Sequence, residues 1–301
     1  MAEKTKFIID TLSLGVHRKP RGDPDTRIAM LPQDCPVTLI GSPDDDWCEV
    51  ETTLDGERLQ GFVRSRFLVP ADERSADKAT HVTEVHLRRD HPYATRAADG
   101  YRPFPIAEHG APERDLDDRR PEAITRIIEW LDVESSARYQ PNGHTTYCNI
   151  YAYDVCYFAK TYLPRVWWTG PALDDLRQGR PVEVRYGETV REMPANDLFW
   201  WLSDFGPKFG WRRVLSPDTV QDAVNRGEVG VICACHRDGN RSGHITAAVP
   251  ETGRHTARRA EDGSVVSPLQ SEAGSDVNLY MTSAYWNNAG TFQDFGFWVH
   301  P

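Results

Sequence analysis

The chain has 301 residues, of which 39% are apolar and 27% charged, and its formal net charge is −10. This composition is that of a globular protein with room for one large domain or two ordinary ones, and it excludes extensive disorder. The excess of acidic residues argues against nucleic acid as a partner, because binding to phosphates needs a basic surface. No apolar run approaches the ~20 residues of a membrane-spanning helix.

The first residues show no export signal. Only a short apolar run, residues 7–9, follows the polar start, without a small-residue cleavage site, so we expect synthesis in the cytoplasm without a signal peptide. The six cysteines, at positions 35, 48, 148, 156, 233 and 235, are spaced like neither a disulfide framework nor a zinc ribbon. Cys233 and Cys235 share one face of a predicted strand and are interpreted as small apolar core residues. We therefore expect neither a metal nor a cofactor.

Residues 11–69 are predicted to form a small barrel of short strands. Apolar and polar residues alternate at 12–16 and 47–51, and turn chemistry at 20–25 and 55–56 separates the strands. The segment resembles a bacterial SH3-like domain, and the residues that carry the resemblance are Trp47, Val50, Gly61, Phe62, Val63 and Leu68. Because such domains often bind cell-wall peptides, the resemblance implies a wall-binding module at 1–70. A spacer barrel without a ligand is the alternative.

Residues 71–120 are predicted to be a linker or an arm wrapped on the next domain. Pro, Asp, Glu, Arg and Ala dominate this segment, and its periodicity is poor. The aromatic residues Tyr93, Tyr101 and Phe104 favour packing over free disorder.

Four helices follow, predicted over 121–131, 148–163, 197–202 and 215–225. The first has Pro121 in its first turn and one apolar stripe. The second is apolar on nearly every side, which indicates a buried, central helix. Asn196 and Ser216 are the predicted caps of the third and fourth helices.

The pattern then changes to period two. Strands are predicted over 230–235, 244–249, 265–266 and 295–300, the second returning antiparallel to the first after a turn at 238–240. Helices followed by an antiparallel sheet predict an α+β domain over 121–301.

Cys148 is the candidate nucleophile. Thr145 and Thr146 are predicted to cap its helix, so the thiol lies in the first turn, where the helix dipole favours a thiolate. His244 begins a strand after Gly243, which leaves room for another element to approach. A cysteine at a helix start followed by a histidine at a strand start is the outline of a papain-like cysteine hydrolase. A buried core thiol and a structural histidine are the alternatives.

The histidine of such a pair needs a group that orients it. If the hairpin pairs Val249 with Val265, then Gln270 falls opposite His244 and its side-chain oxygen accepts from the imidazole. The alternatives for this role are Glu251 and Glu272, and the alternative general bases are His144 and His236. The backbone N–H of Cys148, with one side-chain donor, is predicted to hold the oxyanion.

Residues 120–301 resemble the NlpC/P60 and CHAP groups of papain-like peptidoglycan hydrolases. The resemblance rests on the helix of Cys148, the strand pair that ends in Ser-Gly-His-Ile-Thr-Ala-Ala-Val-Pro at 242–250, and the later polar residue. It implies a catalytic Cys, His and third polar residue that cut amide bonds in cell-wall peptides without a metal. It also implies that Asn142, six residues before the cysteine, holds the oxyanion. The Cys-Asn-Ile sequence departs from the Asp-Cys-Ser-Gly of many NlpC/P60 members.

The resulting expectation is an SH3-like β-barrel followed by a papain-like domain, with bacterial peptidoglycan as the partner. A lysin released by a holin and an effector delivered by a secretion machine both fit a chain without a signal peptide. Trp167, Trp168, Trp200 and Trp201 are predicted to line a substrate groove, with core packing as the alternative. The alternative functions are an inert wall-binding protein and a transglutaminase-like or deamidating toxin. The sequence predicts no oligomeric state.

Overall fold

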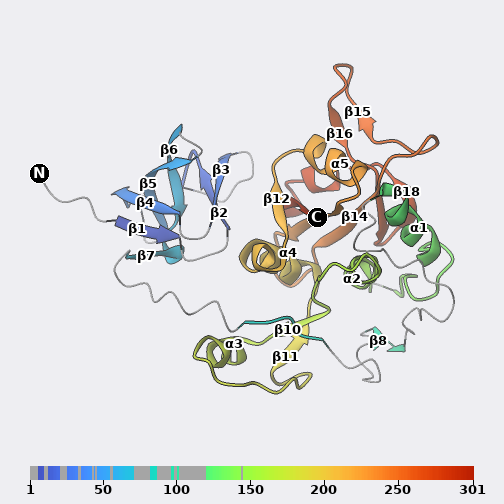
Figure 1. Ribbon diagram of the computed structural model, residues 1–301, viewed down its shortest axis with the longest axis horizontal. Helices are drawn as coiled ribbons and strands as arrows, with labels where there is room; N and C mark the ends of the chain where they lie inside the picture. The colour runs from blue at the N-terminus through green and yellow to red at the C-terminus, as the bar shows by residue number, and fades with distance from the viewer. Residues whose placement is uncertain are drawn as a thin grey trace, which may run out of the picture. The chain divides into compact units, whose positions relative to one another are not determined.

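The computed structural model has a mixed α+β architecture with antiparallel sheets (Figure 1). Its contacts divide the chain into two compact units, Met1–Asp77 with Trp200–Gly210, and Lys78–Phe199 with Trp211–Pro301. The residues that the structure describes are 6–9, 13–20, 26–32, 35–42, 44, 46–54, 57–70, 82–86, 96–97, 100–101, 120–143 and 145–301. Most of the predicted arm at 71–120 lies outside them, and the domain boundaries expected near 70 and 120 stay a prediction.

The first unit contains one antiparallel sheet in the order β3-β2-β6-β5-β4-β1-β7. Its strands are β1 (Lys6–Ile9), β2 (Ser13–His17), β3 (Arg27–Pro32), β4 (Pro36–Gly41), β5 (Trp47–Leu54), β6 (Glu57–Arg64) and β7 (Leu68–Pro70), with a 3₁₀ turn at Ser65–Phe67. The pairing of β5 with β6 up to Leu54 and Glu57 confirms the predicted hairpin. Among the described strands β3 and β7 do not pair with each other, so the predicted closure into a barrel is not seen.

The sheet of the first unit surrounds an aliphatic core that includes Ile9, Val16, Leu31 and Val63, all at most 1% exposed. Gly61 is needed for this packing, because a Cβ atom there would lie 2.6 Å from Val16 Cγ1 and 2.8 Å from the His17 carbonyl oxygen. The glycine therefore permits β2 and β6 to approach closely.

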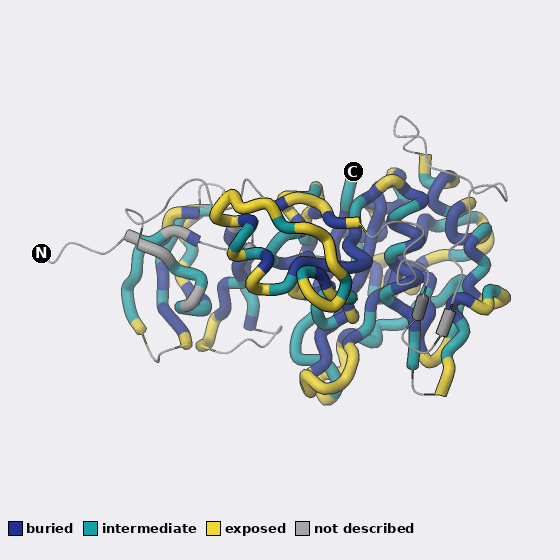
Figure 2. Tube along the Cα trace, turned by 90° about the horizontal axis from the view of Figure 1, so that it is seen from below, coloured by how far each residue is buried: buried dark blue, intermediate teal, exposed yellow. Residues whose placement is uncertain are grey.

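The second unit is built on a six-stranded antiparallel sheet in the order β12-β19-β13-β14-β17-β18. These strands are β12 (Arg212–Val214), β19 (Phe292–His300), β13 (Val229–His236), β14 (His244–Ala248), β17 (Gln270–Ala273) and β18 (Val277–Met281). Three small ribbons pair β8 (Arg96–Ala97) with β9 (Gly100–Tyr101), β10 (Val166–Trp168) with β11 (Val190–Glu192), and β15 (Arg258–Arg259) with β16 (Val265–Ser267). Figure 2 colours the chain by burial, and long buried stretches, drawn in dark blue, run through this unit.

Five α-helices are described: α1 (Pro121–Leu131), α2 (Cys148–Phe158), α3 (Gly170–Arg177), α4 (Ala195–Asp204) and α5 (Pro217–Asn225), with 3₁₀ turns at Gly206–Phe209 and Tyr285–Asn287. The four predicted helices are confirmed, although the second ends at Phe158 rather than at residue 163, and α3 was not predicted. Helix α4 begins at Ala195, so Asn196 lies inside it and the predicted cap is wrong. Ser216 caps α5 as expected, since its hydroxyl accepts a hydrogen bond from the Thr219 N–H at 3.1 Å. None of the described helices is long and apolar enough to cross a membrane.

Helices α2 and α5 pack on opposite faces of the sheet (Figure 1). Helix α5 contacts the face that carries Ile232 and Ala248. Helix α2 reaches the other face, where the Tyr151 hydroxyl lies 2.7 Å from Ser271 Oγ. Ser271 pairs with Ala247, and successive residues of a strand point to opposite faces of the sheet. The contact of α2 with Ser271 and the contact of α5 with Ala248 therefore lie on opposite faces. The start of α2 is thereby set against the middle strands, β14 and β17.

Two predictions about this region are wrong. Val265 does not pair with Val249, because Val265–Ser267 turns back onto Arg258–Arg259, and β17 takes the place beside β14 with Ala248 opposite Gln270. Thr145 and Thr146 do not cap α2: the N-cap is Tyr147, and no side chain bonds there. Thr145 instead exchanges two backbone hydrogen bonds with Asn142 in a tight turn, in which Gly143 has a φ of 59°.

A buried ion pair anchors the middle of α2. Arg138 donates to both carboxylate oxygens of Asp154, at 2.6 and 3.1 Å, and the Tyr139 hydroxyl donates to the same carboxylate at 2.8 Å. All three side chains are at most 3% exposed. Removing one partner of such a pair leaves an uncompensated charge in the interior.

We therefore expect Asp154→Ala to lower the free energy of unfolding by about 3–5 kcal/mol, measured by urea denaturation. The control is Glu261→Ala, which removes an exposed carboxylate from the β15–β16 turn and should change stability by no more than about 0.5 kcal/mol. Equal stability of the two variants would contradict the structural importance of the buried pair.

Candidate active site

Cys148 is the first residue of α2 and is 3% exposed. The imidazole of His244, at the start of β14, and the backbone N–H groups of Ile245 and Asn149 lie close enough to its thiol to lower the pKa of Cys148. The side chain of Asn149 donates to the Met193 carbonyl oxygen at 3.0 Å, which holds the first turn of the helix in place. The structure thus brings together the two residues that the sequence predicts as nucleophile and base.

The two groups shift each other's protonation in the direction of an ion pair. Burial raises the pKa of the Cys148 thiol, but the bond and charge of His244 and the two backbone N–H groups outweigh it, so that this pKa lies below the ordinary value. Burial lowers the pKa of His244, but bonds to Cys148 and Glu272 and their charges raise it above the ordinary value. Both shifts are in the direction that favours a thiolate beside an imidazolium.

Glu272, on the neighbouring strand β17, is the residue that contacts the other side of the imidazole. His244 Nε2 lies 2.6 Å from Glu272 Oε2, and the two side chains are 17% and 13% exposed. This contact leaves Nδ1 of His244 for the thiol. The second oxygen of Glu272, Oε1, accepts a hydrogen bond from Asn278 Nδ2 at 2.9 Å.

The strand register explains why the third residue is Glu272. Ala248 lies opposite Gln270 and Ala247 opposite Ser271, so that Glu272 is a diagonal neighbour of His244 on the same side of the pleat. A Cβ atom on Gly274 would lie 2.9 Å from His244 Cε1, so glycine leaves the room that the ring occupies. The ring of Tyr285 meets the imidazole edge-on, with centroids 4.7 Å apart at 74°.

Gln270 does not lie against His244, which corrects the sequence-based assignment. Its side-chain oxygen accepts from Thr246 Oγ1 at 2.9 Å, and its amide donates to the carbonyl oxygens of Pro268 at 3.1 Å and Ser283 at 2.9 Å. The physical reason is the register, which differs from the one predicted and places Gln270 opposite Ala248 instead of His244. Gln270 is fully buried, and these bonds link β14 to the residues just before β17 and just after β18.

Glu251 is likewise engaged elsewhere. Its carboxylate accepts from Arg259 at 2.5 and 2.9 Å, from Asn225 Nδ2 at 2.8 Å and from the Ala257 N–H at 2.8 Å. These bonds, that of Arg259 first, lower the pKa of Glu251 to about 2. Glu251 thus holds the start of the segment that connects β14 with β17 against a later part of the same segment.

The remaining polar candidates are placed as follows. Asn142 is exposed and belongs to the tight turn that precedes α2, and its role at the oxyanion stays a prediction. His144 lies outside the described residues. His236 is buried at the end of β13, where its Nδ1 accepts from the Asp238 N–H at 2.9 Å.

The predicted tryptophan groove is corrected. Trp167, Trp168 and Trp201 are 4%, 5% and 2% exposed and belong to the interior, as large apolar side chains commonly do. Trp200, at 40%, is exposed. A groove made by all four rings is therefore wrong.

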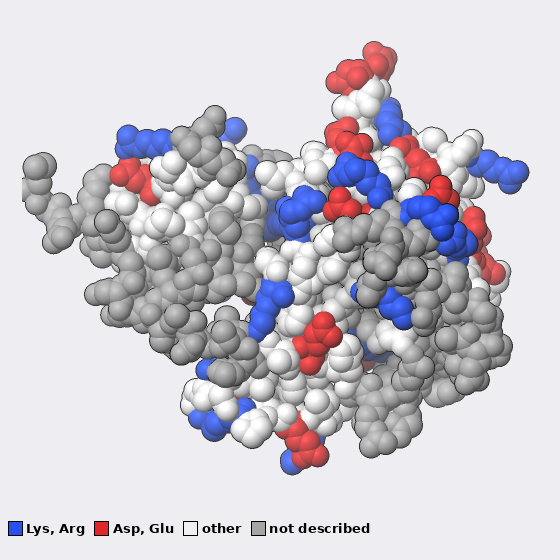
Figure 3. Space-filling view, viewed as in Figure 1, with Lys and Arg blue, Asp and Glu red and all other residues white. Residues whose placement is uncertain are grey.

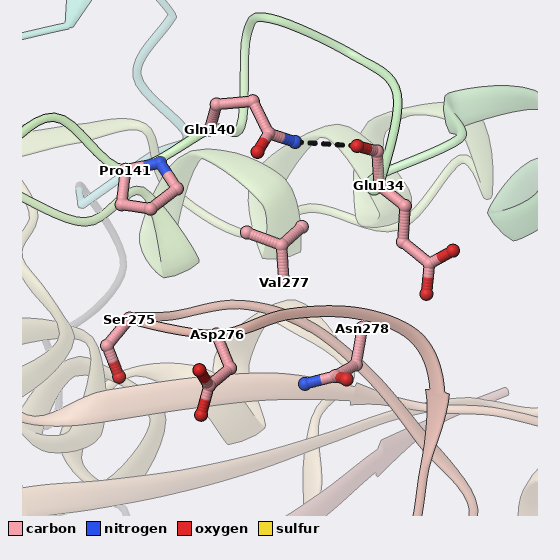
Figure 4. A pocket seen from close by; sticks show the side chains of 7 residues that line it. All are labelled: Glu134, Gln140, Pro141, Ser275, Asp276, Val277 and Asn278. Atoms are coloured by element: carbon pink, nitrogen blue, oxygen red, sulfur yellow. Dashed lines mark hydrogen bonds between the residues drawn. The ribbon is translucent and has the colours of Figure 1, made fainter.

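A pocket is lined in part by Asn278, the residue that binds Glu272 (Figure 4). It has a volume of about 450 Å³ and is lined by Glu134, Gln140, Pro141, Ser275, Asp276, Val277 and Asn278. One wall is the turn between β17 and β18, and the other is the segment before α2, where Gln140 Nε2 donates to the Glu134 carbonyl oxygen at 2.8 Å. Asn278 belongs both to this pocket and to the hydrogen bonds of Glu272.

No group of three or more His, Cys, Asp or Glu side chains in the described parts of the chain is arranged to hold a metal ion. The Sγ atom of Cys233 donates to the Ala195 carbonyl oxygen at 3.3 Å within the core. On the described surface visible in Figure 3, acidic and basic side chains are interspersed.

No protein-family model matches the sequence, and no curated protein shows significant similarity to it. Among solved structures, the chain is similar to NlpC2 from Trichomonas vaginalis, with 9% sequence identity and a TM-score of 0.19. The match covers 98% of this chain and 74% of that one.

The ion pair predicts selective chemistry at one cysteine. Cys148 should react with iodoacetamide well below pH 8.5, the ordinary thiol pKa, because its pKa is lowered, whereas burial raises the pKa of Cys156 and Cys233. Peptide mapping by mass spectrometry after labelling at pH 6 should find the label at Cys148. Labelling of Cys156 or Cys233 ahead of Cys148 in the folded protein would contradict the assignment.

Proposed function

We propose that residues 121–301 form a papain-like cysteine hydrolase and that the protein cleaves amide bonds of bacterial cell-wall peptides. The observation that carries the proposal is the arrangement of Cys148, His244 and Glu272, in which the imidazole lowers the pKa of the thiol and contacts the carboxylate at 2.6 Å. A thiol of lowered pKa at a helix start, an imidazole and an orienting carboxylate are the components that cysteine-dependent acyl transfer requires.

The geometry supports a two-step reaction. The Cys148 thiolate attacks the amide carbonyl carbon, and the negative charge passes to the carbonyl oxygen, which the backbone N–H of Cys148 at the helix start can stabilise. The C–N bond then breaks as the imidazolium of His244 gives its proton to the leaving amine, and a thioester remains. In the second step neutral His244 takes a proton from water, the hydroxide attacks the thioester, and the carboxylic acid leaves as the thiolate reforms.

The carboxylate of Glu272 serves the reaction without touching the substrate. It fixes the ring through Nε2 and stabilises the positive charge that His244 carries before proton transfer. The pocket lined by Asn278, at about 450 Å³, is of the size that binds small ligands and offers space for part of a peptide stem.

The substrate class comes from the sequence. The motifs at 148 and 242–250 resemble peptidoglycan hydrolases, and the segment at 1–70 resembles a bacterial SH3-like domain, a pairing that recurs in cell-wall enzymes and lysins. The seven-stranded sheet of the first unit supports a small β module there. Release by lysis or delivery by a secretion machine would bring the protein to the wall.

We expect wild-type protein to release soluble peptides from purified cell-wall sacculi and Cys148→Ala to lower that rate by at least ~10³-fold, because the attacking atom is lost. Products are identified by mass spectrometry, which reports the bond that is cut. Glu261→Ala, on the exposed β15–β16 turn, is the control and should keep wild-type activity.

The same experiment separates the alternatives. Incorporation of an added primary amine into an acceptor peptide, with little hydrolysis, would favour a transglutaminase-like transferase. Binding of sacculi without release of any fragment would favour an inert wall-binding protein. Equal digestion by wild type and Cys148→Ala would refute the proposed nucleophile.

The structure and the sequence make different predictions for Glu272 and Gln270. Glu272→Gln should lower kcat on the order of 10²-fold and move the alkaline limb of the pH–rate profile to lower pH. The sign follows because Glu272 raises the pKa of His244, so its loss lets the imidazolium deprotonate earlier. Gln270→Ala should leave that limb in place and lower stability by about 1–3 kcal/mol, because buried polar groups lose their partner. The reverse pattern would restore Gln270 as the orienting residue.

A further inference from the structure

Asn278 on β18 lies directly opposite Glu272 on β17. The pairing between these strands is irregular: Gln270 pairs with Met281, and the register then shifts before Glu272. Bulges of this kind redirect a side chain next to a functional site. Here the shift brings the amide of Asn278 within 2.9 Å of Glu272 Oε1, while Oε2 of the same carboxylate contacts His244.

We propose that Asn278 is a positioning residue, which holds Glu272 in the orientation that lets it bind His244. This proposal rests on the proposed function for its catalytic meaning. A glutamate has three rotatable side-chain bonds, and one contact to an imidazole does not fix its carboxylate plane. A second hydrogen bond, to the other oxygen, does so, and bonds to a charged acceptor are the stronger kind.

The backbone of Asn278 is held as well. Its carbonyl oxygen accepts from Ser271 Oγ at 3.1 Å, and that hydroxyl lies 2.7 Å from the hydroxyl of Tyr151 on α2. A continuous set of hydrogen bonds therefore runs from the helix that carries Cys148 to the strand that carries Asn278. This arrangement fixes the donor relative to the nucleophile, as a positioning role requires.

Asn278 also lines the pocket at the β17–β18 turn, but its bond to Glu272 distinguishes it from the other lining residues. The role proposed for it is to orient the carboxylate, which acts on proton transfer. Its loss should therefore lower kcat and leave KM nearly unchanged, whereas loss of a substrate contact raises KM.

The test follows the imidazole of His244 directly. In Asn278→Ala, NMR titration of the His244 ring should give a pKa about one unit lower than in wild type, because the carboxylate no longer stays aligned with Nε2. The kcat on cell-wall peptides should fall about tenfold, which is the rate equivalent of one such unit. In the Glu272→Gln background the same substitution should have no further effect on the titration, since the group that it positions is gone.

Leu279→Ala is the structural control, because it changes the same strand on the opposite face. It should leave the His244 titration at the wild-type position, whatever it does to thermal stability. If Asn278→Ala folds poorly, Asn278→Thr, whose β-branched side chain suits a strand but is too short to reach Glu272, should show the same titration shift.

A wild-type titration in a folded Asn278 variant, or a shift equally large without Glu272, would overturn the proposal. The titration needs no substrate, so its result is distinct from that of the proposed function. A protein that does not digest sacculi but shows the shift would retain the positioning role and lose the cell-wall assignment.

Discussion

The structure of the candidate site depends on how a negative charge is tolerated at a buried sulfur. At 3% exposure a cysteine alone would stay protonated, because taking a thiolate out of water is costly. At Cys148 the imidazole of His244 and two backbone N–H groups near the sulfur oppose this effect and lower the pKa of the thiol. The first turn of a helix supplies one such N–H group, that of Asn149, together with the favourable end of the dipole. Burial and reactivity are thus compatible only while these partners stay in place.

Most of the second unit can be understood as the support for that placement. Helix α2 cannot shift along its axis without breaking the Arg138–Asp154 pair in its middle or the contact of Tyr151 with Ser271. Both contacts lie on the helix that begins with Cys148, the proposed nucleophile. The first ties α2 to the segment that precedes it, and the second ties α2 to the strand that carries Glu272. The buried ion pair holds the middle of α2, and with it the helix start, in one position.

The sequence identifies the cysteine and the histidine of this site, but it gives the third residue, Glu272, only as an alternative to Gln270. Cys148 and His244 are recognisable because each stands at the start of an apolar segment, 148–163 and 244–249. Glu272 is harder to recognise, because β17 shows little apolar alternation and its register depends on a long excursion after Val249. Pro268 separates β16 from β17, so that the strand predicted at 265–266 joins a ribbon instead of the main sheet. The alternation of apolar and polar residues does not show how many residues such a connecting segment contains, so the register of the next strand cannot be predicted from it.

The helix cap shows the same limit at shorter range. Threonines before a helix are good caps by composition, but at Thr145 the backbone is already committed to a turn with Asn142, which leaves Tyr147 as the boundary residue. Residue types in a sequence indicate which side chains are suited to cap a helix. They do not indicate which backbone groups are already hydrogen-bonded in a neighbouring turn.

The second hydrogen-bond donor to Glu272 is an uncharged amide, and this affects the pKa of His244. In the ion-pair state the thiolate and Glu272 carry two negative charges, and His244 carries one positive charge. The described ionic partner of Glu272 is His244, and the second oxygen of the carboxylate is bound by the uncharged amide of Asn278. A lysine or arginine at that place would bind the carboxylate more strongly, but its positive charge would oppose the imidazolium and lower the pKa of His244. An amide stabilises the carboxylate without this competition, and the backbone N–H of Ile245 does the same for the sulfur. Among the described residues, His244, the proposed proton donor, therefore has no charged competitor for the carboxylate of Glu272.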